Sequence, residues 1–371
     1  MYVITFSYPF QKEFIGGGHS IALGFANSLV SKDQDVSLIV PGDIDYEYFG
    51  LSNQVKVRSV KNNRSLIVRQ IYIVFELIKL TMRKKINGVI FFNGESFFFN
   101  VITLCLFRSK TCEYVATPEI PEFSKIKTRR QNFEIYIQYL SLRFLKTKCF
   151  SITDYLKYQM VTRWCLKANQ VEVLMPGVDD VFLSGKDELK SFDPSELKLV
   201  SVGRLEFKQK PIDAVLEALT SVSNINVKSF KIIGDGPDRD KLQKIKDKNK
   251  SDYVEILGSR NKKEIVNIIS ECDVVILPST HESLMLTAYE AMALKKILII
   301  NDVANLKRDL AGFANVIFAE DTKSITYQKC LEDILSFKGQ KKIDEADYAL
   351  LVKNFSWNNK AERIINEFTR P

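Results

Sequence analysis

Hydrophobic and polar positions follow two alternating patterns along the first half of the chain. Short continuous apolar runs are typical of strands buried on both faces, and apolar residues three or four positions apart predict helices packed by one face. Ile21, Phe25 and Leu29 show the second pattern soon after the first apolar run. The predicted strands are residues 2–6, 35–40, 55–60, 88–92, 113–116, 149–153 and 171–174. The predicted helices are residues 19–32, 63–85, 97–107, 132–146 and 154–167. This alternation predicts a parallel, doubly wound α/β sheet.

The alternation stops over residues 178–196 and then begins again. This stretch has no clear periodicity, contains six acidic residues, and includes Gly185 and Pro194, so it predicts a crossing between domains. The second set of predicted strands is 197–202, 227–233, 254–257, 273–278 and 297–300, with helices at 211–219, 238–246, 262–270, 287–293 and 306–310. An amphipathic helix is expected over 357–368. A chain of 371 residues is long enough for two domains, which we place at 1–177 and 178–354.

Charge is distributed unevenly around a net value of +8. Residues 121–170 carry ten Lys or Arg side chains against three acids, and the predicted helix 63–85 ends in Arg83, Lys84 and Lys85. The basic segment could attract an anionic membrane surface or phosphorylated substrates, or it could be an ordinary solvated face. Nucleic acid is a weaker expectation, because no recognisable nucleic-acid-binding module accompanies the charge.

The cysteines and the apolar tracts indicate the cellular compartment in which the protein is expected. The six cysteines form no CxxC pair, which is typical of reduced thiols in a cytoplasmic protein. The first residues lack a basic region, so no signal peptide is expected. The longest apolar tract, residues 89–107, is interrupted by polar residues and is a poor membrane span.

The segment from Pro278 to Ala293 combines a strand end, a polar loop and a helix start. Glu282 falls in the loop, and Glu290 lies about one turn into the predicted helix. A strand followed by a loop and a helix N-terminus presents backbone N–H groups to an anionic ligand. Another interpretation is that Thr287 and Glu290 have the spacing of a capping box that only fixes the helix start.

Two further strand ends carry residues suited to phosphate. Arg204 follows one strand directly, and Lys208 and Lys210 lie in the loop after it. Cations at the carboxyl end of a strand can bind phosphate groups, although each alone could be a surface charge. The second strand end has Gly234 and Gly236 in a Gly-x-Gly turn that lacks the third glycine of the dinucleotide fingerprint. A tight connecting turn is its simplest interpretation.

Taken together in order, these motifs extend over the whole chain. They are GGG at 16–18, PGVD at 176–179, GRL…K at 203–210, GDGP at 234–237, LG at 257–258, PS…E-x7-E at 278–290 and FSW at 355–357. The set resembles the retaining glycosyltransferases of family 4, in the glycosyl transferases group 1. The resemblance is strong over residues 199–300 and weak over 53–170. It implies the GT-B fold, with two Rossmann-like doubly wound domains facing a central cleft, and a final helix (355–371) that packs back on the first domain.

The resemblance implies a role for each motif. Arg204 and Lys210 would hold the donor diphosphate and stabilise the leaving group without metal, and Glu282 would lie against the donor sugar; these three are the expected catalytic residues. The expected donor-binding residues are Gly16, Gly17, Gly18, Arg260, Leu284, Met285, Leu286 and Glu290. Within that set Glu290 would bind the ribose hydroxyls. Gly17 would let a helix N-terminus approach the diphosphate, since a side chain there would obstruct it. Ser259 and Arg260 lie where the family contacts the base.

The sequence also departs from the family pattern on the acceptor side. Many members have a His after the fourth or fifth strand of the first domain, where this chain reads YVATPEIPEF. Thr117 or Glu119 could occupy that place. His19 could touch acceptor or phosphate, or it could be a hydrogen-bonded loop histidine, and the same choice holds for His281. Met285 stands where a small residue is common, so it could narrow the sugar pocket.

The resulting expectation is a metal-independent retaining glycosyltransferase. It needs no cofactor, moves a sugar from a UDP- or GDP-sugar to an acceptor hydroxyl, and serves cell-surface polysaccharide or glycolipid synthesis. Its partners would be a nucleotide-sugar donor, a saccharide or lipid-linked saccharide acceptor and an anionic membrane surface, but no nucleic acid. The expected place is the cytoplasm, at the inner face of the membrane. Two alternatives are a non-catalytic nucleotide-sugar-binding subunit and an NAD-dependent oxidoreductase, whose glycine spacing fits poorly.

Overall fold

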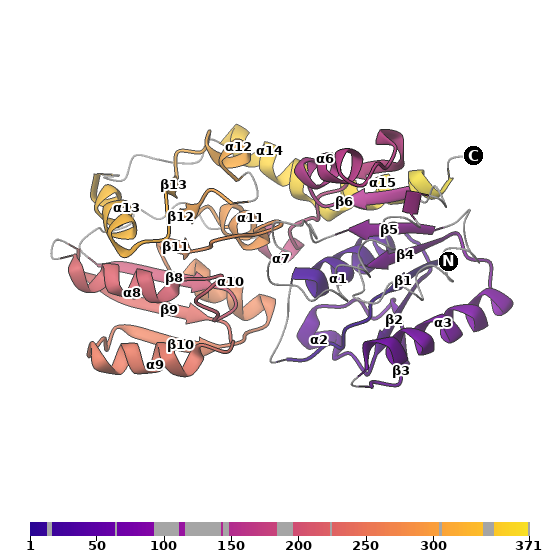
Figure 1. Cartoon of the computed structure of the whole chain (residues 1–371), viewed down its shortest axis with the longest axis horizontal. Coiled ribbons are helices and arrows are strands. Elements are labelled where there is room, and N and C mark those ends of the chain that lie inside the picture. Colours follow the sequence, from indigo (N-terminus) through magenta and orange to yellow (C-terminus); the bar gives the residue numbers. More distant parts are fainter. Residues whose placement is uncertain are drawn as a thin grey trace. The chain divides into compact units, whose positions relative to one another are not determined.

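A computed structural model of the chain forms two units, each built around a parallel sheet (Figure 1). It describes residues 1–12, 17–63, 65–92, 111–115, 142–143, 148–183, 196–222, 225–303, 306–336 and 345–369. One unit holds Met1–Gln11, Ile15–Gly177 and Trp357–Pro371, and the other holds Lys12–Phe14 and Val178–Ser356. Both sheets have the doubly wound, Rossmann-like topology that the alternating pattern predicts.

In the first unit the strand order is β3-β2-β1-β4-β5-β6-β7, and every pair is parallel. The strands are β1 (Tyr2–Thr5), β2 (Val36–Pro41), β3 (Lys56–Val60), β4 (Gly88–Phe92), β5 (Thr111–Val115), β6 (Lys148–Ser151) and β7 (Val171–Val173). The helices include α1 (Gly17–Val30), α2 (Tyr46–Phe49), α3 (Leu66–Arg83), α6 (Asp154–Thr162) and the C-terminal α15 (Trp357–Thr369), with a 3-10 turn at Ala168–Gln170. Strands β1, β2 and β4 are fully buried, which explains their continuous apolar sequence.

In the second unit the order is β10-β9-β8-β11-β12-β13, again all parallel. The strands are β8 (Leu197–Val202), β9 (Val227–Ile233), β10 (Val254–Gly258), β11 (Val274–Leu277), β12 (Ile297–Asn301) and β13 (Val316–Ala319). The helices are α7 (Asp180–Leu183), α8 (Ile212–Ser221), α9 (Arg239–Lys248), α10 (Lys262–Ser270), α11 (Leu286–Ala293), α12 (Leu306–Leu310), α13 (Ser324–Ser336) and α14 (Glu345–Phe355). The apolar core lies between the sheet and helices such as α8 and α13.

The predicted strands recur with small shifts at their ends, but several elements have no counterpart in the prediction. Strand β13 and helices α13 and α14 lie between the predicted helices 306–310 and 357–368, and α7 lies inside the supposed crossing. The helix predicted over 154–167 ends earlier, at Thr162, because Cys165 has the left-handed φ of 53°. The helices predicted at 97–107 and almost all of 132–146 lie outside the described residues.

Helix α15 is anchored in the first unit by large aromatic residues set against glycines. Trp357 packs against Gly24 and Gly177, and a Cβ at Gly177 would approach its ring to 2.7 Å. Phe368 lies against Gly88 in the same way, at 2.6 Å from an added Cβ. Both distances are shorter than side-chain packing allows, so the bare glycine backbone makes the docking of α15 possible. The FSW motif therefore has a packing function.

The topology of the second sheet determines where a ligand can bind. The chain runs outward from β8 to β10 and then returns to begin again at β11 on the other side of β8. The loops that follow β8 and β11 therefore diverge at adjacent strand ends, which is the usual binding crevice of an open α/β sheet. Arg204, Lys210 and Glu282 all lie on these two loops. Within the described part of the chain, no helix is both long enough and apolar enough to cross a membrane.

Candidate active site

An ion pair joins the two loops at the point where the sheet order reverses. The Lys210 ammonium contacts a carboxylate oxygen of Glu282, and these side chains are only 17% and 16% exposed. Two opposite charges withdrawn from water are stabilised mainly by each other. The loop after β8 and the loop after β11 are thus held together by two of the residues expected to act on the donor.

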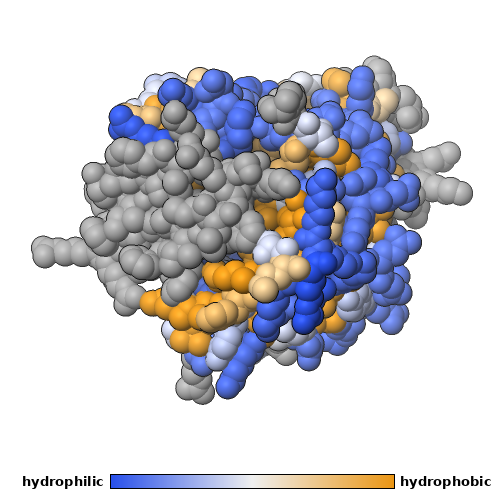
Figure 2. Space-filling view, turned by 90° about the vertical axis from the view of Figure 1, so that its right-hand side faces the viewer, coloured by the Kyte–Doolittle hydropathy of each residue, from blue (hydrophilic) through white to orange (hydrophobic). Residues whose placement is uncertain are grey.

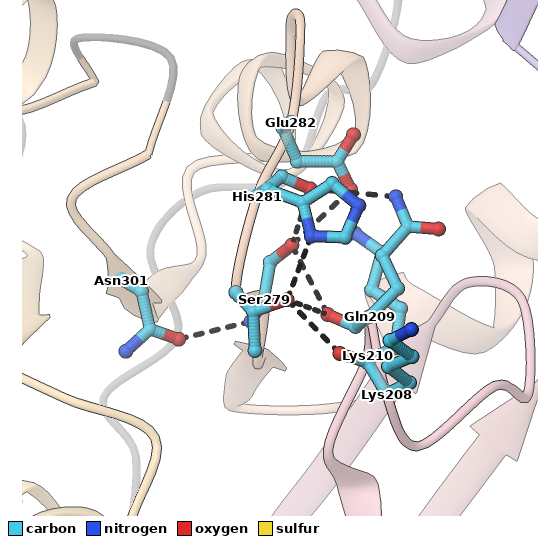
Figure 3. Close-up of polar contacts among 8 residues, drawn as sticks. Lys208, Gln209, Lys210, Ser279, His281, Glu282 and Asn301 are labelled. Atoms are coloured by element: carbon cyan, nitrogen blue, oxygen red, sulfur yellow. Dashed lines mark hydrogen bonds and ion pairs between the residues drawn. The ribbon is translucent and has the colours of Figure 1, made fainter. Parts of the chain in front are cut away.

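Ser279 contacts the Glu282 carboxylate that forms this ion pair (Figure 3). Its hydroxyl lies 3.3 Å from Glu282 Oε1, 3.2 Å from the His281 carbonyl and 3.5 Å from the Gln209 carbonyl. Thr280 adds a backbone bond, donating its N–H to the Gln209 carbonyl at 2.9 Å. The carboxylate of Glu282 therefore sits on a loop whose backbone is fixed on both sides.

Asn301 connects this loop to strands β12 and β13 through hydrogen bonds. Its Oδ1 accepts the Ser279 N–H at 2.9 Å and the Tyr327 hydroxyl at 2.8 Å. Its Nδ2 donates to the carbonyls of Ala319 and Asp321 at 3.2 and 2.8 Å. Asn301 is buried, so each of these bonds replaces one to water. Sequence reasoning missed Asn301 and Ser279, although a polar residue ending the apolar run of β12 was a usable signal.

The Gly-x-Gly turn shapes the other side of the crevice. Gly234 has φ +137°, and a Cβ there would overlap the Gly203 carbonyl. Leu205 donates its N–H to the Asp235 carbonyl at 3.0 Å, and Gly236 lies against the Leu205 backbone. The glycines thus let two loops touch backbone to backbone. In this structure the turn holds the GRL segment in place, which extends the interpretation of a simple connecting turn.

A small hollow remains between these loops. Gly203, Arg204, Lys210, Leu277 and Pro278 are among the residues that line it. The Lys210 stem runs along Gly203, where an added Cβ would lie 3.7 Å from Lys210 Cε. Two cations therefore border a space at the carboxyl ends of β8 and β11.

Arg204 is held more loosely than Lys210. Its side chain is about half exposed, and its Nε lies 3.1 Å from a carboxylate oxygen of Glu206. An exposed pair of this kind contributes little to stability. The guanidinium can therefore turn toward an incoming anion at low cost.

Helix α11 begins at Leu286, and its N-cap residue is Met285. Met285 makes no side-chain capping bond, and the Ala288 N–H reaches the Met285 carbonyl at 3.0 Å. The predicted capping box of Thr287 and Glu290 is therefore wrong, because both residues lie inside the helix. The first N–H groups of a helix lack intrahelical acceptors, so this end can accept an anion. The Met285 side chain is buried, and Leu284 and Leu286 are partly buried.

Glu290 lies on the next turn of α11 in different electrostatic surroundings. Loss of solvent contact raises the pKa of Glu290 to about 7; the Lys262 ammonium partly offsets this, and the Asp179 carboxylate adds to it. Lys262 itself forms an ion pair with Asp179, and α7 packs against both α10 and α11. The cation that partly offsets the pKa shift of Glu290 is therefore itself paired with Asp179. Sequence reasoning recorded the PGVD motif but assigned no role to Asp179 or Lys262.

The remaining predicted residues are placed as follows. Arg260 follows β10 and donates Nη1–H to the Ser259 carbonyl at 3.0 Å, just before the Asn261–Glu264 capping box of α10. His281 Nδ1 lies 2.8 Å from the Thr280 hydroxyl. Gly16, Thr117 and Glu119 lie outside the described residues.

The glycine loop of the first unit leads into α1. Gly17 and Gly18 form its first turn, and a Cβ at Gly17 would meet no atom of the described chain within 4 Å. Packing inside the chain therefore does not explain the glycine at 17. His19 is buried between Phe6 and Phe10, with Nε2 3.1 Å from the Pro9 carbonyl. That environment is typical of a structural histidine.

Among the described residues, no three His, Cys, Asp or Glu side chains gather in a way that could hold a metal ion.

The sequence and the fold both resemble known proteins. Residues 186–348 match the sequence profile of the family described as glycosyl transferases group 1. An uncharacterised 41.2 kDa protein in the cps region of Klebsiella pneumoniae is 26% identical over 305 residues, which cover 79% of this chain and 80% of that protein. Anabaena HepE in complex with UDP-glucose superimposes with a TM-score of 0.75 at 13% identity, covering 99% and 98% of the two chains. WaaG, a glycosyltransferase involved in lipopolysaccharide biosynthesis, gives 0.72 at 13% identity with full coverage of both chains.

The profile match covers the second unit, where the two loops and α11 bring Lys210, Glu282 and Glu290 onto one side of the sheet. The structural matches cover both sheets. The second unit therefore matches the glycosyl transferases group 1 family, and the chain as a whole has the GT-B fold.

Proposed function

We propose that this chain is a retaining, metal-independent hexosyltransferase that moves a sugar from a nucleoside diphosphate sugar to an acceptor hydroxyl. The observation that carries the proposal is the Lys210–Glu282 ion pair at the switch point, with Arg204 on the rim of the same hollow. This arrangement brings two cations and one carboxylate to the strand ends where α/β proteins bind nucleotides.

The cations would act on the diphosphate. Transfer breaks the bond between the anomeric carbon and the β-phosphate oxygen, so negative charge develops on that oxygen. Lys210 and Arg204 would stabilise this charge, together with the backbone N–H groups of Leu284, Met285 and Leu286 at the start of α11. Gly17 would let the α1 N-terminus approach the same diphosphate.

The carboxylates would act on the sugars of the donor. Glu282 would accept hydrogen bonds from hydroxyls of the transferred sugar and would stabilise positive character at the anomeric centre. Its backbone is fixed through Ser279 and Asn301, which is the kind of support that preorganises a catalytic group. Glu290 would accept the ribose hydroxyls, and Arg260 would lie beside the base.

The named similarities support a choice of donor and of pathway for this proposal. HepE binds UDP-glucose, so a UDP-sugar is the first donor to test, with a GDP-sugar as the second. WaaG is involved in lipopolysaccharide biosynthesis, which favours a saccharide or lipid-linked saccharide acceptor in cell-surface polysaccharide or glycolipid synthesis. The proposed place is the cytoplasm, at the inner membrane face.

The contact with the membrane is a separate part of this proposal. The basic segment 121–170 supports attraction to anionic lipid. Sedimentation with anionic vesicles should decrease as salt rises. If sedimentation depended on neither lipid charge nor salt, the proposed membrane contact would be wrong. The proposed transfer reaction would be unaffected.

The decisive experiment is a transfer assay on Arg204→Ala. A charge-assisted contact is worth ~1.5–3 kcal/mol, so turnover should fall by tens-fold or more in a folded protein. Lys208→Ala is the matched control, because Lys208 is an exposed cation on the same loop but does not line the hollow. Near-normal turnover in Arg204→Ala would contradict its role. Wild-type protein that binds donor in a thermal-shift screen but neither hydrolyses nor transfers it would support the non-catalytic subunit instead.

A further inference from the structure

Helix α3 has apolar residues on two faces. Its buried face packs on the sheet through Ile73, Leu77 and Leu80. On the opposite side Ile67, Phe75 and Met82 are 37%, 59% and 82% exposed. With Ile71 and Ile78, which are partly buried, they follow each other three or four positions apart, and we call these five residues the outer face of α3. A helix on the surface of a soluble protein ordinarily has polar residues on that side.

Cations flank this outer face. Lys79, Arg83, Lys84 and Lys85 are all exposed at the C-terminal end of the helix. Figure 2, which views the molecule from the side where α3 lies in Figure 1, shows a band of hydrophobic atoms low on this face with hydrophilic side chains beside it. An apolar stripe beside a cationic flank is the composition of helices that lie in the interface of a membrane.

The acidic groups near α3 do not cancel this charge. Glu76 is the only acid in the sequence of α3, and it is paired with Arg58 at 3.2 Å and with Lys79 at 3.4 Å. Asp35 is paired with Lys56 and Lys84. The helix therefore presents a net positive edge next to its exposed apolar residues.

We propose that the outer face of α3 docks the chain onto a leaflet rich in anionic lipid. The helix would lie in the plane of the interface, with Phe75 and Met82 among the acyl chains and Arg83 and Lys85 among the headgroups. A second copy of the chain fits this face less well, because its own α3 carries no unpaired acid to meet those cations. This inference adds a membrane-docking surface to the proposed function, in which the acceptor lies at the membrane face. It rests on the proposed function only for its biological purpose.

The test measures binding of the full chain to vesicles of neutral lipid and of neutral lipid mixed with phosphatidylglycerol. Phe75→Glu combined with Met82→Glu should weaken binding to the anionic vesicles at least tenfold. Arg83→Gln combined with Lys85→Gln should weaken it about thirtyfold at low salt, since each cation near such a surface contributes about fivefold. Leu350→Glu is the matched control, because Leu350 is a 55% exposed apolar residue on α14 in the other unit.

A second measurement reports insertion directly. Phe75→Trp should show a blue-shifted emission with anionic vesicles and none with neutral ones. Unchanged vesicle binding in both double variants would overturn the proposal. So would a wild-type dimer in lipid-free solution that becomes a monomer in Phe75→Glu, because the face would then be a contact between copies. Donor hydrolysis in solution, measured on the same variants, should stay at the wild-type rate, so a failure here remains distinct from a failure of the proposed reaction.

Discussion

The two ends of the segment 278–293 hold their carboxylates in opposite ways. Glu282 lies on the loop, has Lys210 as a direct ionic partner and receives further support from Ser279. Glu290 lies on α11, where the ammonium that acts on it, that of Lys262, is paired with Asp179 instead. One carboxylate is held by its own cation, and the other is shielded from water without a cation of its own.

This difference indicates different functions for the two carboxylates. A carboxylate paired with a cation keeps its charge and position, which suits a group that must face the reacting sugar. A shielded carboxylate gains from hydrogen-bond donors that arrive with a ligand, because those donors replace the lost water. In the proposed function the hydroxyls of ribose would supply them. The two acids seen eight positions apart in the sequence are thus not equivalent.

The largest expected effect comes from a substitution that breaks the Lys210–Glu282 ion pair. In the proposed function, Lys210→Met removes a donor that would face the developing charge, and loss of such a donor typically lowers turnover by about 10²–10³-fold. It also leaves the Glu282 carboxylate without its cation, so the free energy of unfolding should fall by ~1–3 kcal/mol. Initial rates and chemical denaturation measure the two effects.

A double variant separates stability from catalysis. Lys210→Met combined with Glu282→Gln removes the stranded charge, so it should recover stability but not turnover. If turnover recovered together with stability, the lysine would have only a structural function.

A smaller effect is expected from a substitution of Glu290. Glu290→Gln keeps the shape of the side chain but loses the charge that ribose hydroxyls would meet, so donor affinity should fall about tenfold. Isothermal calorimetry with UDP or GDP measures this. An unchanged affinity would exclude Glu290 from the donor site.

The same variant should be more stable than the wild type above neutral pH. The pKa of Glu290 is raised from 4.5 to about 7, so the folded state holds its proton more tightly than the unfolded state does. Wild-type stability should therefore fall as pH rises from about 4.5 to about 7, by at most ~3 kcal/mol, and Glu290→Gln should lack this fall. Parallel denaturation curves for the two proteins across this range would contradict the assignment.

The sequence predicted the framework well because its causes are local. The run that becomes β11 is apolar throughout and fully buried, since both faces of a parallel sheet are covered. Arg204, Lys210 and Glu282 could be singled out because they lie in the loops that follow β8 and β11. Strand β13 was missed, although its four residues, Val316–Ala319, form an apolar run of the same kind.

The supports of the site could not be predicted, because their causes are distant in sequence. Asp179 and Lys262 are 83 positions apart, and Ser279 meets Asn301 only when β11 and β12 pair. The start of α11 was misjudged for a related reason. Thr287 and Glu290 have the right spacing for a cap, but Tyr289 donates to Asp309 and stacks on Phe355, so tertiary contacts hold the helix there.

The smallest expected effect comes from the pair beside Glu290. Asp179→Asn removes a like charge and releases Lys262, so the pKa of Glu290 should fall. In the wild type, donor affinity should rise as pH passes through about 7, because the charged carboxylate accepts the ribose hydroxyls. In Asp179→Asn this rise should move about one pH unit lower, giving about threefold tighter binding near pH 6.5. Asp180→Asn is the control, since it removes the neighbouring exposed charge and leaves the Lys262 pair intact. The same shift in both variants, or in neither, would show that the Asp179–Lys262 pair does not set the charge of Glu290.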